Sequence, residues 1–180
     1  MANVQGDTKM SLEYELRFKK PIAMLAHKAL LNTYYTASCL RKKASDFLRP
    51  FGLTDVQFNL MMLLQHQSGT REGLSQAQLS NMMLVNRANI TSLIDRMEKA
   101  DFVIRTPAPS DRRSNIVKLT SRGKRVLARI EPLYAKEVKR IMATLKQAEQ
   151  KKLIAMLEKI RCNITEQSAQ QVRDLSAVRV

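Results

Sequence analysis

The spacing of apolar residues predicts that the chain begins with a long amphipathic helix. From Lys19 to Leu48, apolar side chains recur at alternating steps of three and four, which places them on one face of a helix. Pro21 suits the first turn of such a helix, and Pro50 with Gly52 ends it. The predicted apolar face consists of Ile22, Ala26, Leu30, Thr33, Ala37, Leu40, Ala44 and Phe47.

Three shorter helices are predicted next, because a residue that can cap a helix precedes each one. Thr54 with Gln57, and Ser75 with Gln78, have the spacing of a capping box. Asn86 caps the third of these helices. The apolar residues of that third helix fall on a single inner face, formed by Ile90, Leu93, Ile94 and Met97.

The apolar period changes after Asp101. Two short segments rich in β-branched residues, 102–106 and 114–119, flank a proline-rich turn and predict a β-hairpin. Thr120 then begins another long helical pattern, and a last helix follows it. The predicted fold is therefore mainly α with a small β-hairpin wing, that is, a winged helix-turn-helix domain with a helical dimerisation lobe.

The same patterns divide the chain into five segments. Both ends lack a sustained apolar period, so we expect them to be arms or tails. The segments are a flexible N-terminal arm (1–18), a long first helix for dimerisation (19–52), the winged helix-turn-helix domain (53–120), the C-terminal dimerisation helices (121–168) and a tail (169–180).

Charge narrows the choice of partner. The chain has 31 Lys and Arg against 16 Asp and Glu, a formal net charge of +15, which favours nucleic acid first and an anionic membrane second. Residues 71–129 hold twelve basic and five acidic side chains, more excess charge than either flanking part. No run of 18 apolar residues and no secretory signal occurs, so we expect a soluble, cytoplasmic protein without membrane contact.

The residues offer little for catalysis or metal binding. Cys39 and Cys162 lie far apart without zinc-ligand spacing, so we expect buried free thiols rather than a disulfide or a metal site. His27 and His66 are the only histidines, and the chain has no phosphate-binding glycine loop or nucleophile elbow. The sequence thus predicts a protein that is not an enzyme and needs no cofactor.

Two short helices followed at once by a basic hairpin predict a surface for duplex DNA. The first turns of the second helix carry short polar groups and an arginine, and Arg can read guanine while Asn can read adenine in the major groove. The alternative interpretation is a solvated polar helix face. The predicted DNA-binding residues on these helices are Ser75, Gln76, Asn86, Arg87, Asn89, Thr91, Ser92 and Arg96.

The turn of the hairpin adds a second candidate contact. Arg112 and Arg113 follow Asp111 at its tip. A guanidinium on a thin loop can enter the minor groove, and the neighbouring carboxylate can hold it in one rotamer. The alternative is an exposed turn with an incidental charge pair, because Asp-Arg-Arg alone is a weak motif.

Taken together, these residues resemble the MarR family of winged-helix repressors. The resemblance covers roughly residues 20–165, and its specific parts are the helix 85–99, the Asp-Arg-Arg turn in 110–114 and the Leu-Thr-x-x-Gly start in 118–123. It implies an obligate homodimer whose two wings straddle a pseudopalindromic DNA operator. One departure is Asp101, where the family usually has glycine; we expect it either to adopt a left-handed conformation or to end the helix differently.

The resemblance also implies a ligand-controlled repressor. Many proteins of this kind release DNA when a small aromatic or phenolic acid binds between the dimer lobe and the winged domain. His27, Tyr34 and Tyr35 are the candidate ligand-binding residues, because the first two share one face of the first helix and Tyr35 is adjacent. Packing at the dimer interface is the alternative role for these three residues.

Two further functions stay open at this point. Some family members sense oxidants through a cysteine near the start of the first helix, whereas Cys39 lies in its middle, followed by Arg41 to Lys43. A winged-helix module used only for protein contacts is the other alternative. Steep loss of binding with salt distinguishes a DNA-binding protein from such a module.

Overall fold

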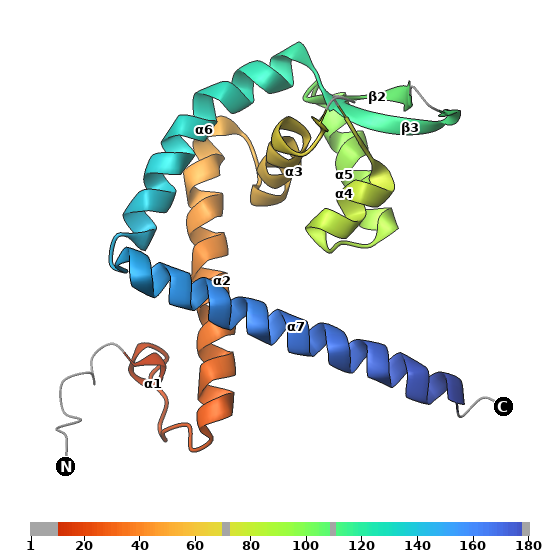
Figure 1. Cartoon of the computed structure of the whole chain (residues 1–180). Helices are drawn as coiled ribbons and strands as arrows, with labels where there is room; N and C mark the ends of the chain where they lie inside the picture. Colours follow the sequence, from red (N-terminus) through yellow and green to blue (C-terminus); the bar gives the residue numbers. More distant parts are fainter. Residues whose placement is uncertain (1–10, 70–72, 109–110, 178–180) are drawn as a thin grey trace. The chain divides into compact units, whose positions relative to one another are not determined.

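The structure is a computed structural model that describes residues 11–69, 73–108 and 111–177; the side chains of Arg87, 111–114 and 168–177 are also outside the description. Figure 1 labels the helices and strands, and the chain divides into two units, 1–127 and 128–180. Unit 1 contains α1 (Leu12–Glu15), α2 (Leu25–Leu48), η2 (Arg49–Phe51), α3 (Asp55–His66), β1 (Leu74–Ser75), α4 (Gln76–Met83), α5 (Arg87–Lys99), β2 (Val103–Ala108) and β3 (Asp111–Leu119).

The predicted hairpin is confirmed and is part of a three-stranded antiparallel sheet with the order β1-β3-β2. Val103 pairs with Leu119 at the base of the hairpin, and Ala108 pairs with Asp111 at its far end. β1 was not predicted, because a strand of two residues is too short to show a periodic pattern. Ser75 pairs with Ile116, so the start of α4 is attached directly to the wing.

The core of unit 1 lies among α3, α4, α5 and the sheet. Each of these helices contributes side chains with no exposed surface, because each has one continuous apolar face. All four residues predicted for the inner face of α5 are buried. The completely inaccessible side chains are Leu60, Met61, Leu79, Ile90, Ile94, Met97 and Val117.

The first long helix begins later than the sequence pattern predicts. α2 starts at Leu25, so Pro21 precedes the helix and does not form its first turn. The Glu13 carboxylate pairs with Lys28 at 2.8 Å and accepts a 3.5 Å hydrogen bond from the Ile22 backbone. These contacts hold the residues before Leu25 outside the helix. The apolar periodicity of the helix cannot reveal them.

Residues 11–18, expected to be a flexible arm, are instead held against the rest of unit 1. Leu12 is 3% exposed, and the Ser11 hydroxyl caps α1 by accepting from Tyr14 N. The hydrogen bond from Lys28 lowers the pKa of Glu13. The ion pair therefore persists as pH falls, and it is lost only at a pH below the one at which a glutamate ordinarily becomes protonated.

The helix α5 ends in a left-handed residue, as one of the two expectations for Asp101 required. Asp101 has φ +56°, its N–H bonds to Glu98 O at 3.0 Å, and Phe102 N bonds to Met97 O at 2.9 Å. This pattern satisfies carbonyls that the helix end leaves without partners. Aspartate thus fills the place where glycine is usual.

Helix α6 (Ser121–Met142) crosses the division between the units, and α7 (Gln147–Ala177) lies in unit 2. α7 extends to Ala177 and so includes residues expected to form a tail. Gln150 Nε2 donates to Met142 O and Leu145 O, which closes the turn between the helices. None of the described helices contains an apolar stretch of the length needed to span a lipid bilayer.

The expectation of buried thiols is wrong. Cys39 on α2 and Cys162 on α7 are both exposed and unbonded to each other. Both lie on faces of long helices that are not covered within the single chain. The apolar character of cysteine was therefore not enough to predict that these two residues would be buried. Cys162 Sγ lies 3.3 Å from Glu166 Oε1.

Candidate nucleic-acid interface

The turn between α4 and α5 is fixed by local hydrogen bonds. Both predicted capping features are confirmed: Ser75 and Gln78 form a complete capping box, and Asn86 Oδ1 accepts from Asn89 N at 2.8 Å. Ser80 Oγ donates to Val85 O at 2.5 Å across the turn. The side chains of Ser75 and Asn86 therefore already have structural roles as helix caps.

Leu84 closes this turn in a strained conformation. Its φ is +51° and its side chain is 92% exposed, so the Cβ costs energy without a packing gain. Replacing Leu84 with glycine is expected to raise the free energy of unfolding by about 1 kcal/mol. Urea denaturation measures this. Leu84→Ala keeps the Cβ and is the matched control; an equal gain from alanine would contradict the strain explanation.

Helix α5 presents a definite outward stripe. Residues spaced three and four apart lie on one face, and the face opposite the buried Ile90, Ile94 and Met97 carries exposed residues. Among the predicted contacts whose side chains the structure describes, only Ser92 is central on this outward face. The stripe is formed by Ala88, Ser92, Asp95 and Lys99.

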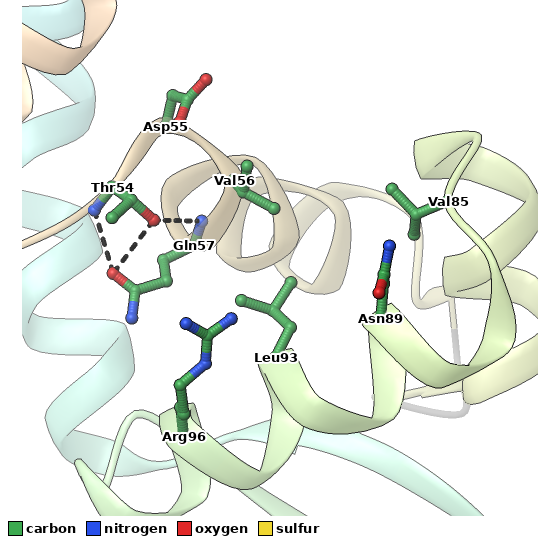
Figure 2. Close-up of a pocket in the computed structure, with 8 residues that line it drawn as sticks. All are labelled: Thr54, Asp55, Val56, Gln57, Val85, Asn89, Leu93 and Arg96. Carbon is green, nitrogen blue, oxygen red and sulfur yellow. Dashed lines mark hydrogen bonds between the residues drawn. The ribbon is translucent and has the colours of Figure 1, made fainter.

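Asn89 and Arg96 occupy one flank of α5. Both are exposed and line a hollow of about 430 Å³ toward the start of α3, together with Val56, Val85 and Leu93 (Figure 2). Arg96 Nε donates a 3.3 Å hydrogen bond to Ser92 O. A ligand or phosphate reaching these two side chains would therefore approach from the α3 side of the helix.

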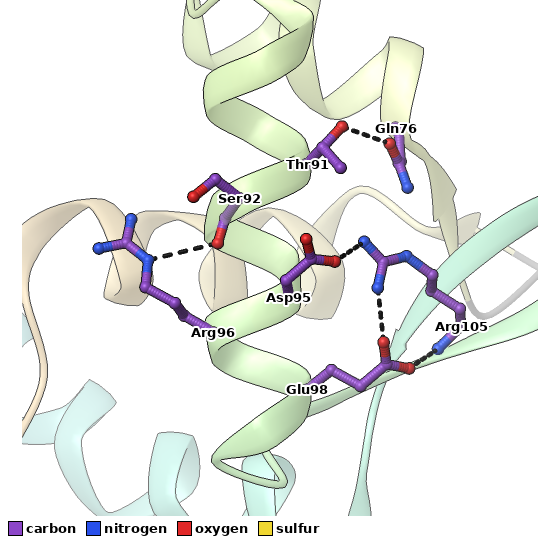
Figure 3. A network of polar contacts seen from close by, with 7 residues as sticks. All are labelled: Gln76, Thr91, Ser92, Asp95, Arg96, Glu98 and Arg105. Atoms are coloured by element: carbon purple, nitrogen blue, oxygen red, sulfur yellow. Dashed lines mark hydrogen bonds and ion pairs between the residues drawn. The ribbon is translucent and has the colours of Figure 1, made fainter.

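Thr91 lies on the opposite flank and is half-buried. Its hydroxyl donates to Gln76 Oε1 at 3.1 Å, which links the first turn of α4 to α5 (Figure 3). Two predicted DNA contacts are thus brought together by the fold. The hydrogen bond between Gln76 and Thr91 joins the two helices, a structural role that the sequence did not indicate.

Arg105 of β2 connects the wing to α5 through three polar contacts (Figure 3). Its Nη2 lies 2.6 Å from Asp95 Oδ1, its Nη1 lies 2.5 Å from Glu98 Oε2, and its backbone N donates to Glu98 Oε1 at 2.9 Å. Burial alone would lower the pKa of Arg105, but the bonds to the two carboxylates outweigh it and the pKa is raised. Arg105 is therefore a permanent cation whose charge is already paired.

The predicted wing contacts lie partly outside the described residues. The backbone of Asp111, Arg112 and Arg113 forms the first three residues of β3, at the far end of the hairpin from α6. Their side chains, and that of Arg87 at the first position of α5, are not described. The bracing of a wing arginine by Asp111 stays a prediction.

Comparison with known proteins agrees with this arrangement. The model of the MarR family matches residues 53–115, from just before α3 into β3. The HTH-type transcriptional repressor Rv2887 of Mycobacterium tuberculosis is 30% identical over 127 residues, which are 71% of this chain and 88% of that protein. The chain belongs to the MarR family. It is thus a member of a family of transcriptional regulators, which are not enzymes.

One further relative and one solved structure are similar to this MarR-family chain. The transcriptional activatory protein BadR of Rhodopseudomonas palustris is 32% identical over 102 residues, 57% of this chain and 58% of BadR. A mutant of Escherichia coli MarR, C80S, complexed with operator DNA, is 21% identical and superposes with a TM-score of 0.65 over 73% of this chain and 93% of that one. That superposition shows a shared fold.

The predicted ligand-binding residues of this MarR-family chain are only partly brought together. Tyr34 and Tyr35 line a mostly apolar hollow of about 270 Å³ between α2 and the segment before it, whereas His27 does not line it. Repulsion between the Tyr35 phenolate and the negative charge of an ionised Cys39 raises the pKa of Tyr35. The other lining residues are Leu12, Leu16, Phe18, Leu31 and Ser38.

Several residues of the candidate interface were not indicated by the sequence. Ala88 is exposed at the centre of the outward stripe, and a methyl group there is suited to contact the methyl of thymine. Asp95 and Glu98 were not assigned a role either. Their spacing of three, which puts two carboxylates on one helix face, was the available signal, but their partner Arg105 lies on another element and no local pattern identifies it.

Proposed function

We propose that this chain binds a specific DNA duplex through α5 and the wing. The observation that carries the proposal is the division of α5 into a fully buried inner face and an exposed polar face, directly followed by a basic hairpin. An α-helix with such a face fits the major groove, and a hairpin can follow the neighbouring minor groove. The operator complex of the structurally similar MarR variant supports this assignment.

Selection of bound sequences from a pool of random duplexes tests the proposal. Recovery of a sequence with two related half-sites about 10 base pairs apart is expected for a symmetric protein. A pool that shows no enrichment after repeated rounds would contradict sequence-specific binding. Enrichment of a single half-site would retain DNA recognition but contradict the symmetric arrangement.

We also propose that the working form is a homodimer. Large apolar side chains on α2 and α7 are exposed in the single chain, among them Leu30 and Leu40 on the first and Ile154 and Ile160 on the second. Covering such faces is a main driving force for association. Light scattering should give twice the chain mass of 20.6 kDa; a monomer at micromolar concentration would contradict the proposal.

Asn89 is proposed to take part in reading the bases. Its side chain is exposed in the first turn of α5, and a base contact of this kind contributes roughly 1–3 kcal/mol of discrimination. Asn89→Ala should therefore reduce the preference for the operator over a scrambled duplex by about tenfold. Competition binding measures the ratio, and an equal loss of affinity on both duplexes would contradict base reading.

We further propose that the chain represses transcription and is released by a small aromatic or phenolic acid. The hollow beside Tyr34 and Tyr35 has aromatic walls, phenolic hydroxyls and a volume suited to a small ring compound. Release of labelled operator by such acids tests the proposal, with Tyr34→Leu as the variant that should weaken the response. If millimolar concentrations of these acids left operator binding unchanged, the proposal would be wrong.

A further inference from the structure

The contacts of Arg105 form a defined bridge between the wing and α5, the proposed recognition helix. One carboxylate, that of Glu98, receives both the backbone N–H and the guanidinium of the same residue, while Asp95 receives the other end of the guanidinium. Because Glu98 and Asp95 are three apart on α5, the bridge fixes the direction of β2 along the helix as well as its distance. We name Arg105, Asp95 and Glu98 the wing clamp.

The wing clamp is more shielded than an ordinary surface ion pair. The Arg105 side chain is 21% exposed, against 67% for Arg140, which pairs with Glu137 within α6. A planar guanidinium can bond two carboxylates at once in fixed geometry, whereas a lysine ammonium is a compact point charge. Arginine is therefore the side chain that can bond both carboxylates and hold β2 in a fixed orientation to α5.

The wing clamp lies at a position in the hairpin from which it orients the tip. β2 follows α5 through a three-residue link, 100–102, and Arg105 lies directly opposite Val117 of β3 in the sheet. Beyond that pair the hairpin extends to Ala108 and Asp111. Holding Arg105 thus fixes the strand whose far end leads to Arg112 and Arg113.

We propose that Arg105 is a positioning residue that joins the wing and the recognition helix into one rigid reading unit. The inference rests on the proposed DNA binding by these two elements. Major- and minor-groove contacts must be made at a fixed separation, so loss of the clamp lowers the binding of the correct sequence more than the binding of any duplex. The residue acts through the wing and itself contacts no DNA.

The clamp also masks two negative charges. Asp95 lies on the outward stripe of α5, where an unpaired carboxylate would repel DNA phosphates. Arg105→Ala changes both geometry and charge, so it cannot separate the two roles. Arg105→Lys keeps the charge and removes the planar fork, which makes it the decisive variant.

The experiment compares Arg105→Lys with the wild-type chain and with Arg140→Lys, which makes the same change in an ion pair of α6. Affinity is measured for the selected operator and for a scrambled duplex, and hydrogen exchange of β2 and β3 amides is measured without DNA. For Arg105→Lys we expect about tenfold weaker operator binding, less than twofold change on the scrambled duplex, and at least fivefold faster wing exchange. Arg140→Lys should change none of these quantities.

If Arg105→Lys changed neither the hydrogen exchange of the wing amides nor the affinity for the operator, the proposed role of the wing clamp would be wrong. Equal losses on both duplexes would also overturn it, because they would indicate a charge effect. If the wild-type chain failed to distinguish operator from scrambled duplex, the proposed function would fail, and the exchange measurement would still decide whether Arg105 orders the wing. The amides of α3 and α5 report whether the variant remains folded.

Discussion

Replacing Gly123 with alanine is expected to lower the free energy of unfolding by about 3 kcal/mol, toward the upper end for overpacked sites. An added Cβ would lie 2.2 Å from Phe102 O and 3.1 Å from Phe102 C. Both are backbone atoms, so no side-chain rotation can relieve the contact. Urea denaturation followed by circular dichroism measures the loss.

The environment of Gly123 explains why the cost is high. Thr120 Oγ1 accepts from Gly123 N at 2.9 Å and donates to Asp101 O at 2.6 Å. The start of α6 is thereby attached to the residue that ends α5. Moving Gly123 away from Phe102 would break this cap, so the chain cannot relax in that direction without a second loss.

Gly52 provides the matched control. Its φ is +68°, but an added Cβ would meet nothing within 4 Å. Gly52→Ala should therefore cost only about 1 kcal/mol, the price of a left-handed alanine. If Gly123→Ala were no more destabilising than Gly52→Ala, the close approach to Phe102 would not be a determinant of stability.

Removing Arg112 and Arg113, the two arginines at the tip of the wing, is expected to weaken DNA binding by about 100-fold, on operator and scrambled duplex alike. The reason is that a guanidinium in the minor groove responds to the negative potential there, which every duplex shares to some degree. The variant is Arg112→Ala combined with Arg113→Ala. Fluorescence anisotropy against salt should also show a slope smaller by about 2, one for each lost phosphate-type contact.

The matched control removes two charges elsewhere. Lys151 and Lys152 are adjacent and exposed on α7, so replacing both with alanine lowers the net charge by the same amount. That variant should lose less than a factor of three, because α7 is not part of the helix and wing through which DNA binding is proposed. Equal losses in the two double variants would mean that total charge, rather than the wing, governs affinity.

Features set by neighbours in the sequence could be predicted. The capping residues Thr54, Ser75 and Asn86 act on backbone groups three residues away, so a short pattern contains all the necessary information. The left-handed Asp101 was one of the two outcomes expected because the MarR family usually has glycine at this position. The inner face of α5 followed from periodicity alone.

Features set by contacts between distant segments could not be predicted. The late start of α2 depends on Glu13, and the short strand β1 exists only because β3 lies beside it. The wing clamp joins Arg105 to residues seven and ten positions earlier on another element. The exposure of Cys39 likewise depends on what covers α2, which composition does not indicate.

The most direct test of the central claim is the salt dependence of binding to the selected operator and to a scrambled duplex of equal length. We predict that the logarithm of the association constant falls linearly with the logarithm of salt concentration for both. At equal salt, the operator should be bound at least about 1,000-fold more tightly. Equal affinity for the two duplexes, or affinity independent of salt, would contradict sequence-specific DNA binding through α5 and the wing.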